Sequence, residues 1–403
     1  MKYGLLGKSL KHSYSKEIHE SLGYYKYKYF EEDNLDKFFD RDDIKAINVT
    51  IPYKTEVIKY LDEISDDAKK IGCVNTITFG DKIKGYNTDI DGMEYMIKRT
   101  IELKGKTVVI LGDGATSKTA IECAKRLKAK KIKVISRKGE HKFEDIDYYK
   151  NCDVIINTTP VGMYPNNLES PINVLKIKPK AVFDVIYNPN KTSLLMDCDR
   201  LRIKNDNGLR MLVYQAVKAC EIFTGKKIDD KIVENIAQKI RTKNMNIALV
   251  GMPGCGKSTI AKIIEDKSGK KLVDIDRVIS DRYGNISEIF AAKGERYFRK
   301  IESEVLEEFS KEKNLVIATG GGTVTVRKNF YYLHQNSVVY WIDRPNSKLS
   351  TKNRPIYKTN TMQEIREQRN HLYKRFSDKY FKNYNAKSTA KLVLEDFNET
   401  IYY

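Results

Sequence analysis

Short apolar runs alternate with segments of helical periodicity through the middle of the chain. Apolar runs at 107–111, 132–135, 154–156 and 181–185 are too short for helices and are typical of buried strands. Between the first two runs, segment 117–127 has the pattern of a helix. Because strands that alternate with helices usually form βαβ units, this pattern predicts a parallel sheet with crossover helices.

Two apolar runs end in glycines and are followed by stretches that can form a helix. The first reads TVVILGDG at 107–114, and the second reads NIALVG at 246–251. A strand that leads through glycines into a helix is the typical opening of an α/β nucleotide-binding unit. A separate α/β segment precedes residue 104, with strands expected at 2–6, 46–49 and 74–78.

The 403-residue chain is too long for one hydrophobic core, and these signals divide it into three α/β domains. We expect a substrate-binding domain at 1–103 and a Rossmann dinucleotide-binding domain at 104–207. A P-loop domain of the nucleoside-monophosphate-kinase type is expected at 247–403. Helices within 208–240 are expected to complete the first domain, and the polar stretch 241–246 is the best candidate for a linker.

Composition narrows the class of protein. Apolar residues make up 41% of the chain, as in globular proteins, and no apolar run reaches the roughly 18 residues that span a bilayer. The six cysteines are widely scattered and include no C-x-x-C pair, so neither a disulfide framework nor a zinc site is indicated. We therefore expect a cytoplasmic protein with no membrane partner.

The charge balance leaves two interpretations open. The chain has 73 Lys and Arg against 54 Asp and Glu, a formal net charge of +19. A basic surface can bind nucleic acid or attract anionic metabolites and nucleotides, and a Lys-rich composition can also carry no functional meaning. Because the basic residues are dispersed and form no arm-like block, we expect small-molecule substrates and no nucleic-acid partner.

Residues 251–258 read GMPGCGKS and match the phosphate-binding pattern G-x-x-x-x-G-K-S. The glycines let backbone N–H groups surround phosphate oxygens, which a Cβ would obstruct. Lys257 is expected to reach the β- and γ-phosphates, and the Ser258 hydroxyl is expected to ligate Mg²⁺. The pattern predicts an ATP site formed by Gly251, Gly254, Cys255, Gly256, Lys257, Ser258 and Thr259.

A second glycine loop, GDGATS at 112–117, has the first two glycines of the pattern G-x-G-x-x-G but a serine at the third place. The next apolar run leads into Arg137 and Lys138, near the place where NAD enzymes usually carry an acidic residue. Two cations there favour the 2′-phosphate of NADP. The expected NADP(H) site includes Gly112, Gly114, Ala115, Arg137 and Lys138.

Seven short strings, each weak alone, occur in an order that resembles the shikimate dehydrogenases. They read GKSLKHSYS at 7–15, NVTIPYK at 48–54, GCVNT at 72–76, NTD at 87–89, NTTPVGM at 157–163, DVIYNP at 184–189 and GLRMLVYQ at 208–215. The resemblance implies NADPH-dependent reduction of 3-dehydroshikimate. One departure is that the family often shows Asn-Arg-Thr where this chain has Ser-Arg-Lys at 136–138.

The resemblance assigns Lys54 and Asp89 as the catalytic pair. Reducing a ketone needs a proton delivered to oxygen as hydride arrives at carbon, and a lysine paired with a carboxylate can relay that proton. Ser13 and Ser15 would hydrogen-bond the substrate carboxylate as hydroxyl donors. By the same resemblance, Thr50, Asn75 and Gln215 would bind the ring hydroxyls, and Tyr187 would face the substrate. On the cofactor side, the implied residues are Asn157, Thr159 and Gly208.

The chain after the linker resembles the shikimate kinases, with strings VDID at 273–276, GERYFRKIE at 294–302 and TGGG at 319–322. Asp274 and Asp276 are expected at a strand end, where residues i and i+2 point to one side. By resemblance, Asp274 would hold Mg²⁺ through water. Asp276 would bind the substrate hydroxyls and accept the proton as phosphate transfers.

Arginines and glycines complete the implied kinase site. Arg299 would pair with the substrate carboxylate through its two-pronged guanidinium, and Glu302, one helical turn on, would orient it. Arg369 would be the second carboxylate-binding arginine, and Arg354 would touch the transferring phosphate and stabilise its charge. The glycine backbone that approaches the ring would be that of Gly320, Gly321 and Gly322.

Together these patterns predict a bifunctional enzyme of chorismate biosynthesis that uses NADP(H), ATP and Mg²⁺. It would reduce 3-dehydroshikimate to shikimate and phosphorylate shikimate to shikimate 3-phosphate. An alternative keeps the kinase but lets the first half oxidise quinate, use NAD, or sense a ligand without catalysis. The presence of Lys54, Asp89, Lys257 and Asp276 argues against an inactive half.

Overall fold

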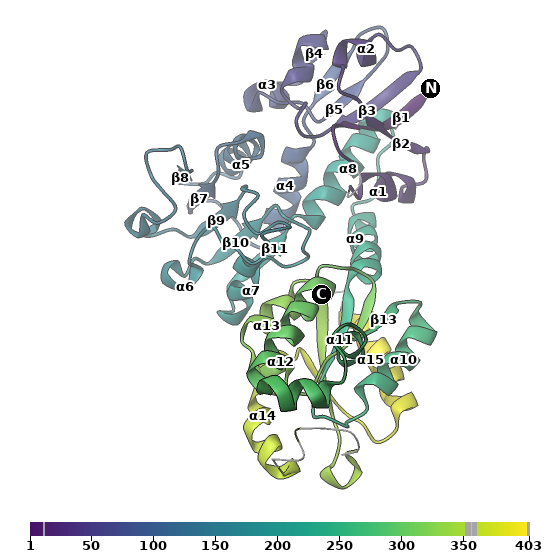
Figure 1. Ribbon diagram of the computed structural model, residues 1–403. Helices are drawn as coiled ribbons and strands as arrows, with labels where there is room; N and C mark the ends of the chain where they lie inside the picture. The colour runs from purple at the N-terminus through teal and green to yellow at the C-terminus, as the bar shows by residue number, and fades with distance from the viewer. Residues whose placement is uncertain (11–12, 351–355, 357–360, 401–403) are drawn as a thin grey trace. The chain divides into compact units, whose positions relative to one another are not determined.

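The computed structural model describes residues 1–10, 13–350, 356 and 361–400, and its described part separates into two compact units (Figure 1). Unit 1 contains Met1–Asn188 and Thr192–Ala237, and unit 2 contains Pro189–Lys191 and the chain from Gln238 onward. Both units are α/β, as predicted. No helix among the described residues has the length and apolar character needed to cross a membrane.

The first sheet of unit 1 has six strands in the order β2-β1-β3-β5-β6-β4. Strand β5 runs antiparallel to both of its neighbours, and the other pairs are parallel. The strands are β1 (Lys2–Gly7), β2 (Tyr27–Glu31), β3 (Ile44–Val49), β4 (Glu63–Ile64), β5 (Thr76–Thr78) and β6 (Lys84–Tyr86). Its helices are α1 (Ser15–Ser21), α2 (Leu35–Phe39), the 3₁₀ helix η1 (Glu56–Tyr60) and α3 (Asp66–Ile71). The three strands predicted in this segment are confirmed, although the third begins at Thr76.

The second sheet of unit 1 is entirely parallel, in the order β11-β10-β9-β7-β8, which confirms the predicted βαβ pattern. The strands are β7 (Thr107–Leu111), β8 (Lys131–Ile135), β9 (Val154–Asn157), β10 (Ala181–Asp184) and β11 (Lys204–Asn207). The helices are α5 (Ala115–Arg126), η2 (Ile146–Tyr149), α6 (Val174–Ile177) and α7 (Ser193–Arg200). Side chains of β7 alternate between two apolar cores, one on each face, so the sheet is buried on both sides.

Helices α4 (Asp89–Lys98) and α8 (Leu209–Thr224) pack closely against each other in unit 1. The contact depends on Gly92, because a Cβ there would lie 2.4 Å from the carbonyl oxygen of Met211. This packing places the first residue of α4, Asp89, and the α8 residue Gln215 in one part of the unit, beside the first sheet.

Helix α9 (Lys231–Asn244) continues through the stretch proposed as a linker, so residues 241–244 form its last turn. The Lys270 ammonium donates hydrogen bonds to the carbonyl oxygens of Thr242 (2.9 Å) and Met245 (2.8 Å). These bonds satisfy carbonyls that have no partner at a helix end. The first strand of unit 2 follows directly at Asn246.

Unit 2 is built around a five-stranded parallel sheet in the order β13-β14-β12-β15-β16. The strands are β12 (Asn246–Val250), β13 (Lys271–Asp274), β14 (Leu315–Ala318), β15 (Ser337–Asp343) and β16 (Lys379–Lys382). The helices are α10 (Lys257–Ser268), α11 (Ile275–Tyr283), α12 (Ile286–Ser310), η3 (Thr323–Thr325), α13 (Lys328–His334), η4 (Asn346–Lys348), α14 (Met362–Phe376) and α15 (Ala386–Thr400). The central strand β12 is fully buried and leads through the glycine loop into α10.

The expectation that both carboxylates of the VDID string lie on a strand end is wrong for Asp276. Strand β13 ends at Asp274, and α11 begins at the next residue. The Asp274 side chain accepts the backbone N–H of Arg277 at 3.2 Å, which makes it the N-cap of α11. An aspartate at this position starts a helix, and Asp276 therefore lies in the first helical turn.

Candidate active sites

Lys54 and Asp89 form an ion pair that is largely shielded from water in unit 1. Lys54 Nζ lies 2.6 Å from Asp89 Oδ2, and the two side chains are 19% and 15% exposed. Burial by itself lowers the pKa of the Lys54 ammonium, but the charge and the hydrogen bond of Asp89 outweigh it and raise that pKa above its ordinary value. The pair therefore holds a proton at a fixed position.

A hydrogen-bonded group of buried side chains joins the first sheet to α8. Asn75 Nδ2 donates to Gln215 Oε1 at 3.3 Å and to Thr88 Oγ1 at 3.1 Å. In return, Asn75 Oδ1 accepts the backbone N–H of Thr88 at 2.7 Å. Because Thr88 precedes Asp89 directly, the residues predicted to bind ring hydroxyls are tied to the start of the helix that carries the catalytic carboxylate.

Ser13 and Ser15 lie side by side at the start of α1. Ser13 Oγ donates to Ser15 Oγ at 3.1 Å, and it accepts the backbone N–H of Ser15 at 3.2 Å. The hydroxyl of Tyr29 donates to the carbonyl oxygen of Ser13 at 2.8 Å, which fixes this turn to β2. Two hydroxyls at this separation suit the two oxygens of one carboxylate.

Tyr187 approaches this serine turn from the second sheet. Its ring centroid lies 5.5 Å from that of Tyr14, the residue between the two serines. Burial raises the pKa of the Tyr187 hydroxyl above its ordinary value. Thr50 follows the end of β3, where its backbone N–H donates to the carbonyl oxygen of Leu6 at 2.9 Å. The predicted substrate residues of unit 1 therefore come from loops beside both sheets, from the start of α1 and from α8.

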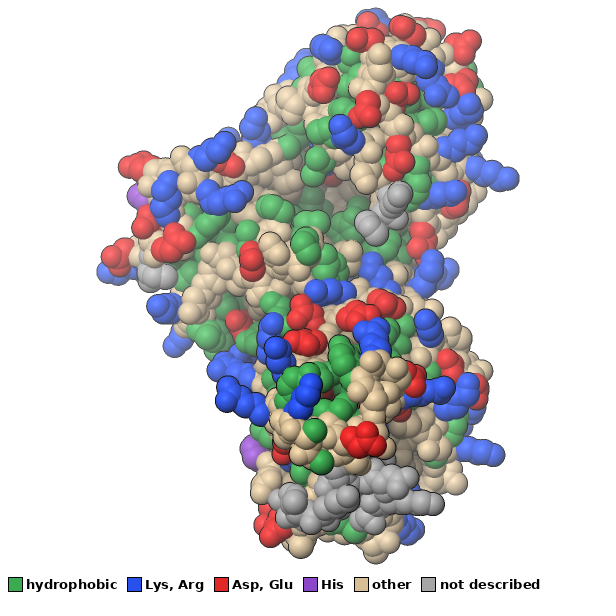
Figure 2. Space-filling view, viewed as in Figure 1, with side chains coloured by type: hydrophobic (Ala, Val, Ile, Leu, Met, Phe, Trp, Pro, Cys, Tyr) green, Lys and Arg blue, Asp and Glu red, His purple; other side chains and the backbone are tan. Residues whose placement is uncertain are grey.

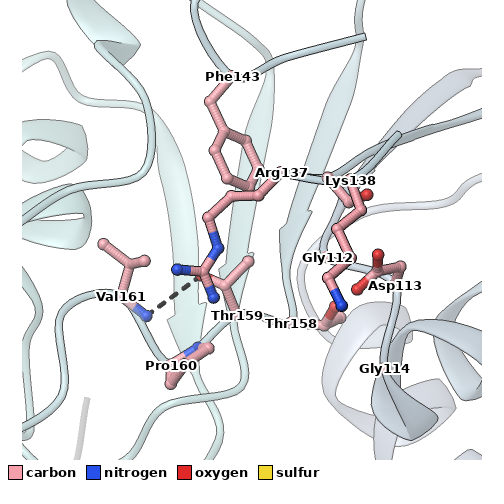
Figure 3. Close-up of a pocket in the computed structure, with 11 residues that line it drawn as sticks. Gly112, Asp113, Gly114, Arg137, Lys138, Phe143, Thr158, Thr159, Pro160 and Val161 are labelled. Atoms are coloured by element: carbon pink, nitrogen blue, oxygen red, sulfur yellow. Dashed lines mark hydrogen bonds between the residues drawn. The ribbon is translucent and has the colours of Figure 1, made fainter. Parts of the chain in front are cut away.

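Most of the predicted dinucleotide residues line a cavity of about 380 Å³ at the carboxyl end of the second sheet (Figure 3). In this view, Arg137 extends toward Thr159 and Val161, and Lys138 extends alongside Asp113. The lining consists of Gly112, Asp113, Gly114, Ser136, Arg137, Lys138, Phe143, Thr158, Thr159, Pro160 and Val161. Ala115 begins α5 directly beside it.

The cavity fits an anionic dinucleotide. Gly112 has φ +108°, and a Cβ there would lie 2.9 Å from Thr158 Oγ1, whereas no atom lies within 4 Å of a Cβ at Gly114. The loop backbone is therefore open to a ligand at the amino end of α5, where helix N–H groups favour phosphate oxygens. Arg137 and Lys138 add two cations to the same lining, as a 2′-phosphate requires.

Asn157 and Thr159 are joined at the edge of this cavity. Asn157 Oδ1 accepts the backbone N–H of Thr159 at 3.1 Å and its hydroxyl at 2.7 Å. Gly208 packs against Val185, and a Cβ there would lie 2.0 Å from the Val185 carbonyl oxygen. The close approach of the two backbones leaves no room for a Cβ at position 208. The expected place of Gly208 near the cofactor stays a prediction.

In unit 2, the phosphate loop has the backbone that its glycines predict. Gly251, Gly254 and Gly256 have φ values of +147°, +82° and +100°, which other residues rarely adopt. The Lys257 ammonium is buried and donates to the carbonyl oxygens of Gly251 at 2.8 Å and Met252 at 3.1 Å. Ser258 and Thr259 are exposed in the first turn of α10, Cys255 is buried, and Asp274 is partly exposed at the end of β13.

The three glycines after β14 bring separate parts of unit 2 together. A Cβ at Gly320 would lie 2.1 Å from Glu302 Oε1 and 2.9 Å from Asp276 Oδ1. A Cβ at Gly321 would lie 2.5 Å from Pro253, which belongs to the phosphate loop. The glycine backbone therefore lies between the predicted proton acceptor and the predicted ATP site.

The two predicted carboxylate-binding arginines share one glutamate. Arg299 Nη2 lies 2.8 Å from Glu295 Oε1, and Arg369 Nη2 lies 3.7 Å from the same oxygen. Arg299 Nη1 also pairs with the buried Glu302 at 2.8 Å, which orients it as expected. Arg369 Nη1 donates to the carbonyl oxygen of Gly321 at 3.1 Å, so α12 and α14 present both guanidinium groups at the glycine turn.

Several supporting residues carried no signal in the sequence. Phe143 lines the dinucleotide cavity, and Tyr373 donates its hydroxyl to the carbonyl oxygen of Gly321 at 2.5 Å. Asn383 Nδ2 donates to the carbonyl oxygen of Cys255 at 2.7 Å and thereby holds the phosphate loop. The partners of Tyr373 and Asn383 are far away in the chain, so local patterns do not reveal these two contacts. Arg354, predicted to contact the transferring phosphate, lies outside the described residues.

Comparison with known proteins matches both units. Residues 5–77 match the shikimate dehydrogenase substrate binding domain, residues 208–238 match the shikimate 5′-dehydrogenase C-terminal domain, and residues 253–401 match shikimate kinase. A shikimate dehydrogenase (NADP(+)) from Clostridium beijerinckii is 38% identical over 259 residues, which are 58% of this chain and 96% of that protein. A second, from Methanosphaera stadtmanae, is 40% identical, over 55% of this chain and 91% of that protein. The crystal structure of shikimate dehydrogenase 1 from Peptoclostridium difficile has a TM-score of 0.54 and 38% identity, over 60% of this chain and 98% of that one.

The sheets and sites therefore define a dinucleotide-dependent oxidoreductase joined to a P-loop kinase. The chain belongs to the shikimate dehydrogenase family, and a shikimate kinase domain follows in the same polypeptide. The predicted fusion and the predicted fold class are both confirmed.

Proposed function

We propose that the chain is a bifunctional enzyme that reduces 3-dehydroshikimate to shikimate with NADPH and phosphorylates shikimate with ATP and Mg²⁺. The observation that carries the first activity is the 2.6 Å contact between Lys54 and Asp89 in a largely buried setting. The shikimate kinase match and the convergence of Asp276, Glu302 and Arg299 on the glycine turn support the second. Its substrates are small molecules.

Lys54 is the proposed proton donor for the reduction. NADPH, when bound along the cavity of Arg137 and Lys138, supplies the hydride to the ketone carbon of 3-dehydroshikimate. Lys54 delivers a proton to the ketone oxygen, so the π bond of the carbonyl breaks, a C–H and an O–H bond form, and the C–O single bond remains. Asp89 stabilises the protonated lysine and fixes its direction, since the two atoms are held 2.6 Å apart. Ser13 and Ser15 hold the substrate carboxylate away from the reacting carbon.

Asp276 is the proposed proton acceptor in the phosphorylation. The hydroxyl formed by the first activity is the one that the resemblance implies is phosphorylated by the second. Arg299 and Arg369 bind the shikimate carboxylate, which orients this hydroxyl toward the phosphate loop. Lys257 and backbone N–H groups of the loop hold the phosphates, and Ser258 and Asp274 would hold Mg²⁺, which neutralises phosphate charge when bound.

The proposed domains follow the predicted divisions, with substrate binding at 1–103 and 208–240, dinucleotide binding at 104–207 and kinase activity at 247–403. The cytoplasmic location stays a prediction. A nucleic-acid role has little support from the surface, because Figure 2 shows Lys and Arg side chains interspersed with Asp and Glu over the visible face. Use of quinate or NAD by unit 1 is the remaining alternative for substrate and cofactor.

A coupled assay on the purified full chain tests the proposal. We expect NADPH oxidation with 3-dehydroshikimate, and ADP release with shikimate, ATP and Mg²⁺. Parallel reactions with quinate and with NAD measure the alternatives. ADP release without NADPH oxidation would contradict the dehydrogenase assignment, and NADPH oxidation without ADP release would contradict the kinase assignment.

A further inference from the structure

Asp184 is a completely buried carboxylate at the end of strand β10, and its role in either reaction is not assigned by the sequence. Its three hydrogen-bond donors are all neutral groups. Oδ1 accepts Asn157 Nδ2 at 3.0 Å and the backbone N–H of Ile186 at 3.1 Å. Oδ2 accepts the hydroxyl of Thr192 at 2.7 Å. Burying a carboxylate that only neutral donors contact costs free energy, so we expect this side chain to serve a role.

The hydrogen bond from Asn157 connects Asp184 to the cofactor cavity. Asn157 uses its amide nitrogen to bind Asp184 and its amide oxygen to accept both the N–H and the hydroxyl of Thr159. Thr159 Oγ1 then accepts the backbone N–H of Val161 at 3.2 Å, the bond drawn in Figure 3. Because Thr159 and Val161 line the cavity, the orientation of Asn157 sets the shape of one wall.

The hydrogen bond from the Ile186 N–H connects Asp184 to the predicted substrate residues of unit 1. Ile186 precedes Tyr187, whose ring contacts Tyr14 in the serine turn. The same oxygen of Asp184 therefore fixes the backbone beside Tyr187 and the amide of Asn157. A loop on the cofactor side and a loop on the substrate side share one acceptor atom.

We propose that Asp184 is a positioning residue that holds the Asn157–Val161 loop and the Tyr187 loop in register through the acceptor geometry of Oδ1, and that its negative charge is dispensable. This inference rests on the proposed dehydrogenase function. It extends that function to a residue that touches neither substrate nor cofactor but aligns the loops that do.

One substitution separates the hydrogen-bond geometry of Asp184 from its negative charge. In Asp184→Asn, the amide oxygen can keep both bonds made to Oδ1, and the amide nitrogen can donate to Thr192. The Thr192 hydroxyl can reverse its role because a hydroxyl both donates and accepts. Asp184→Ala removes both acceptor oxygens, and with them all three hydrogen bonds, so the buried Asn157 amide and Ile186 N–H lose this acceptor.

Steady-state kinetics of the full-length variants test the proposal. We expect Asp184→Ala to raise KM for NADPH about tenfold or more and to lower kcat, since buried donors in both loops lose their acceptor. Asp184→Asn is expected to stay within about threefold of the unmodified chain in both constants, a rescue that the retained acceptor predicts. The kinase rate of each preparation serves as an internal measure of intact protein.

Asp153→Ala is the matched control. Asp153 directly precedes β9, at the amino end of the same sheet, where it accepts the backbone N–H of Thr107 at 2.9 Å. We expect it to lower the melting temperature of unit 1 without changing KM for NADPH. Equal impairment of Asp184→Asn and Asp184→Ala would overturn the proposal, as would an unchanged KM in a folded Asp184→Ala protein. If Asp184→Ala does not fold, near-normal kinetics of Asp184→Asn still support it. Absence of reductase activity in the unmodified chain would contradict the proposed function itself.

Discussion

The Lys54 ammonium and the Asp89 carboxylate lie 2.6 Å apart, although 35 positions separate them in the chain. Lys54 follows the end of β3, and Asp89 begins α4, so the contact exists only because the first sheet and that helix meet. Its partial burial strengthens the attraction between the two charges and excludes much of the water that would compete for the proton.

Replacing Lys54 tests whether the two activities use separate sites. Lys54→Ala should lower the reductase kcat by about 10²- to 10⁴-fold, the usual contribution of a positioned proton donor. The kinase rate should stay near normal. Lys257→Ala is the reciprocal variant and should remove ADP release while preserving NADPH oxidation. Loss of both activities from either single change would contradict the two-site arrangement.

Removing Arg137 tests the cofactor preference. Hydrogen bonds to charged groups contribute about 1.5–3 kcal/mol, so Arg137→Ala should lower kcat/KM for NADPH about tenfold to a hundredfold. The value for NADH should change little, because NADH lacks the 2′-phosphate. Lys130→Ala removes an exposed charge at the other end of β8 and controls for net charge. Equal losses with both cofactors would show that Arg137 does not read the 2′-phosphate.

The buried Asp184 should make unit 1 less stable as pH rises from about 4 to about 7. Burial raises the pKa of Asp184 to about 7, well above the ordinary value near 4 that applies to the unfolded chain. Between these values the folded state binds more protons than the unfolded state, so this group's contribution to stability falls as pH increases. Asp184→Asn removes that contribution.

The stability difference between Asp184→Asn and the unmodified chain should therefore shift in favour of the variant from about pH 4 to pH 7 and level off above. Denaturant melts of unit 1 at a series of pH values measure it. A difference that is independent of pH would show that Asp184 titrates normally in the folded state.

Glu295 lies between the two arginines that we assign to the shikimate carboxylate, and its side chain is 46% exposed. A carboxylate there competes with the substrate for the same guanidinium groups. Glu295→Gln should lower KM for shikimate by a few fold, the effect of removing an exposed ion pair of up to about 1 kcal/mol. Glu302→Gln removes the charge of the buried partner that orients Arg299, and it should raise KM for shikimate. An increased KM in Glu295→Gln would show that this glutamate supports the site and does not compete with the substrate.

Asn383 should affect ATP binding indirectly, because its amide holds the phosphate loop. Its Nδ2 donates to the Cys255 carbonyl oxygen, and a Cβ at Gly256 would lie 2.6 Å from that nitrogen. Asn383→Ala should raise KM for ATP about fivefold to tenfold, because one buried acceptor in the phosphate loop loses its donor. Asn385→Ala removes only a helix cap two residues away and controls for stability. Equal KM values in the two variants would contradict the role of Asn383.

The contiguous motifs were the most predictable part of the site. The glycine loops at 112–117 and 251–258 were recognised because the glycines that permit their backbone conformations are close neighbours in the chain. Asp276 was misplaced because the strand pattern gave no sign that Asp274 caps a helix. The close approach of Gly208 to Val185 carried no signal in the sequence either, because the packing of α8 creates it.

The sequence by itself determined the two enzyme families, the order of the domains and the residue types at the reacting centres. Short contiguous strings and their order along the chain carry these features, so they can be read without knowing which residues meet in space. Only the tertiary structure decided which distant groups share a hydrogen bond, as the side chains of Asp184 and Asn157 do and as the Asn383 amide does with the Cys255 carbonyl. The physical reason is that a buried polar group must find a partner, and the sheet topology, not the spacing along the chain, sets which groups are within reach.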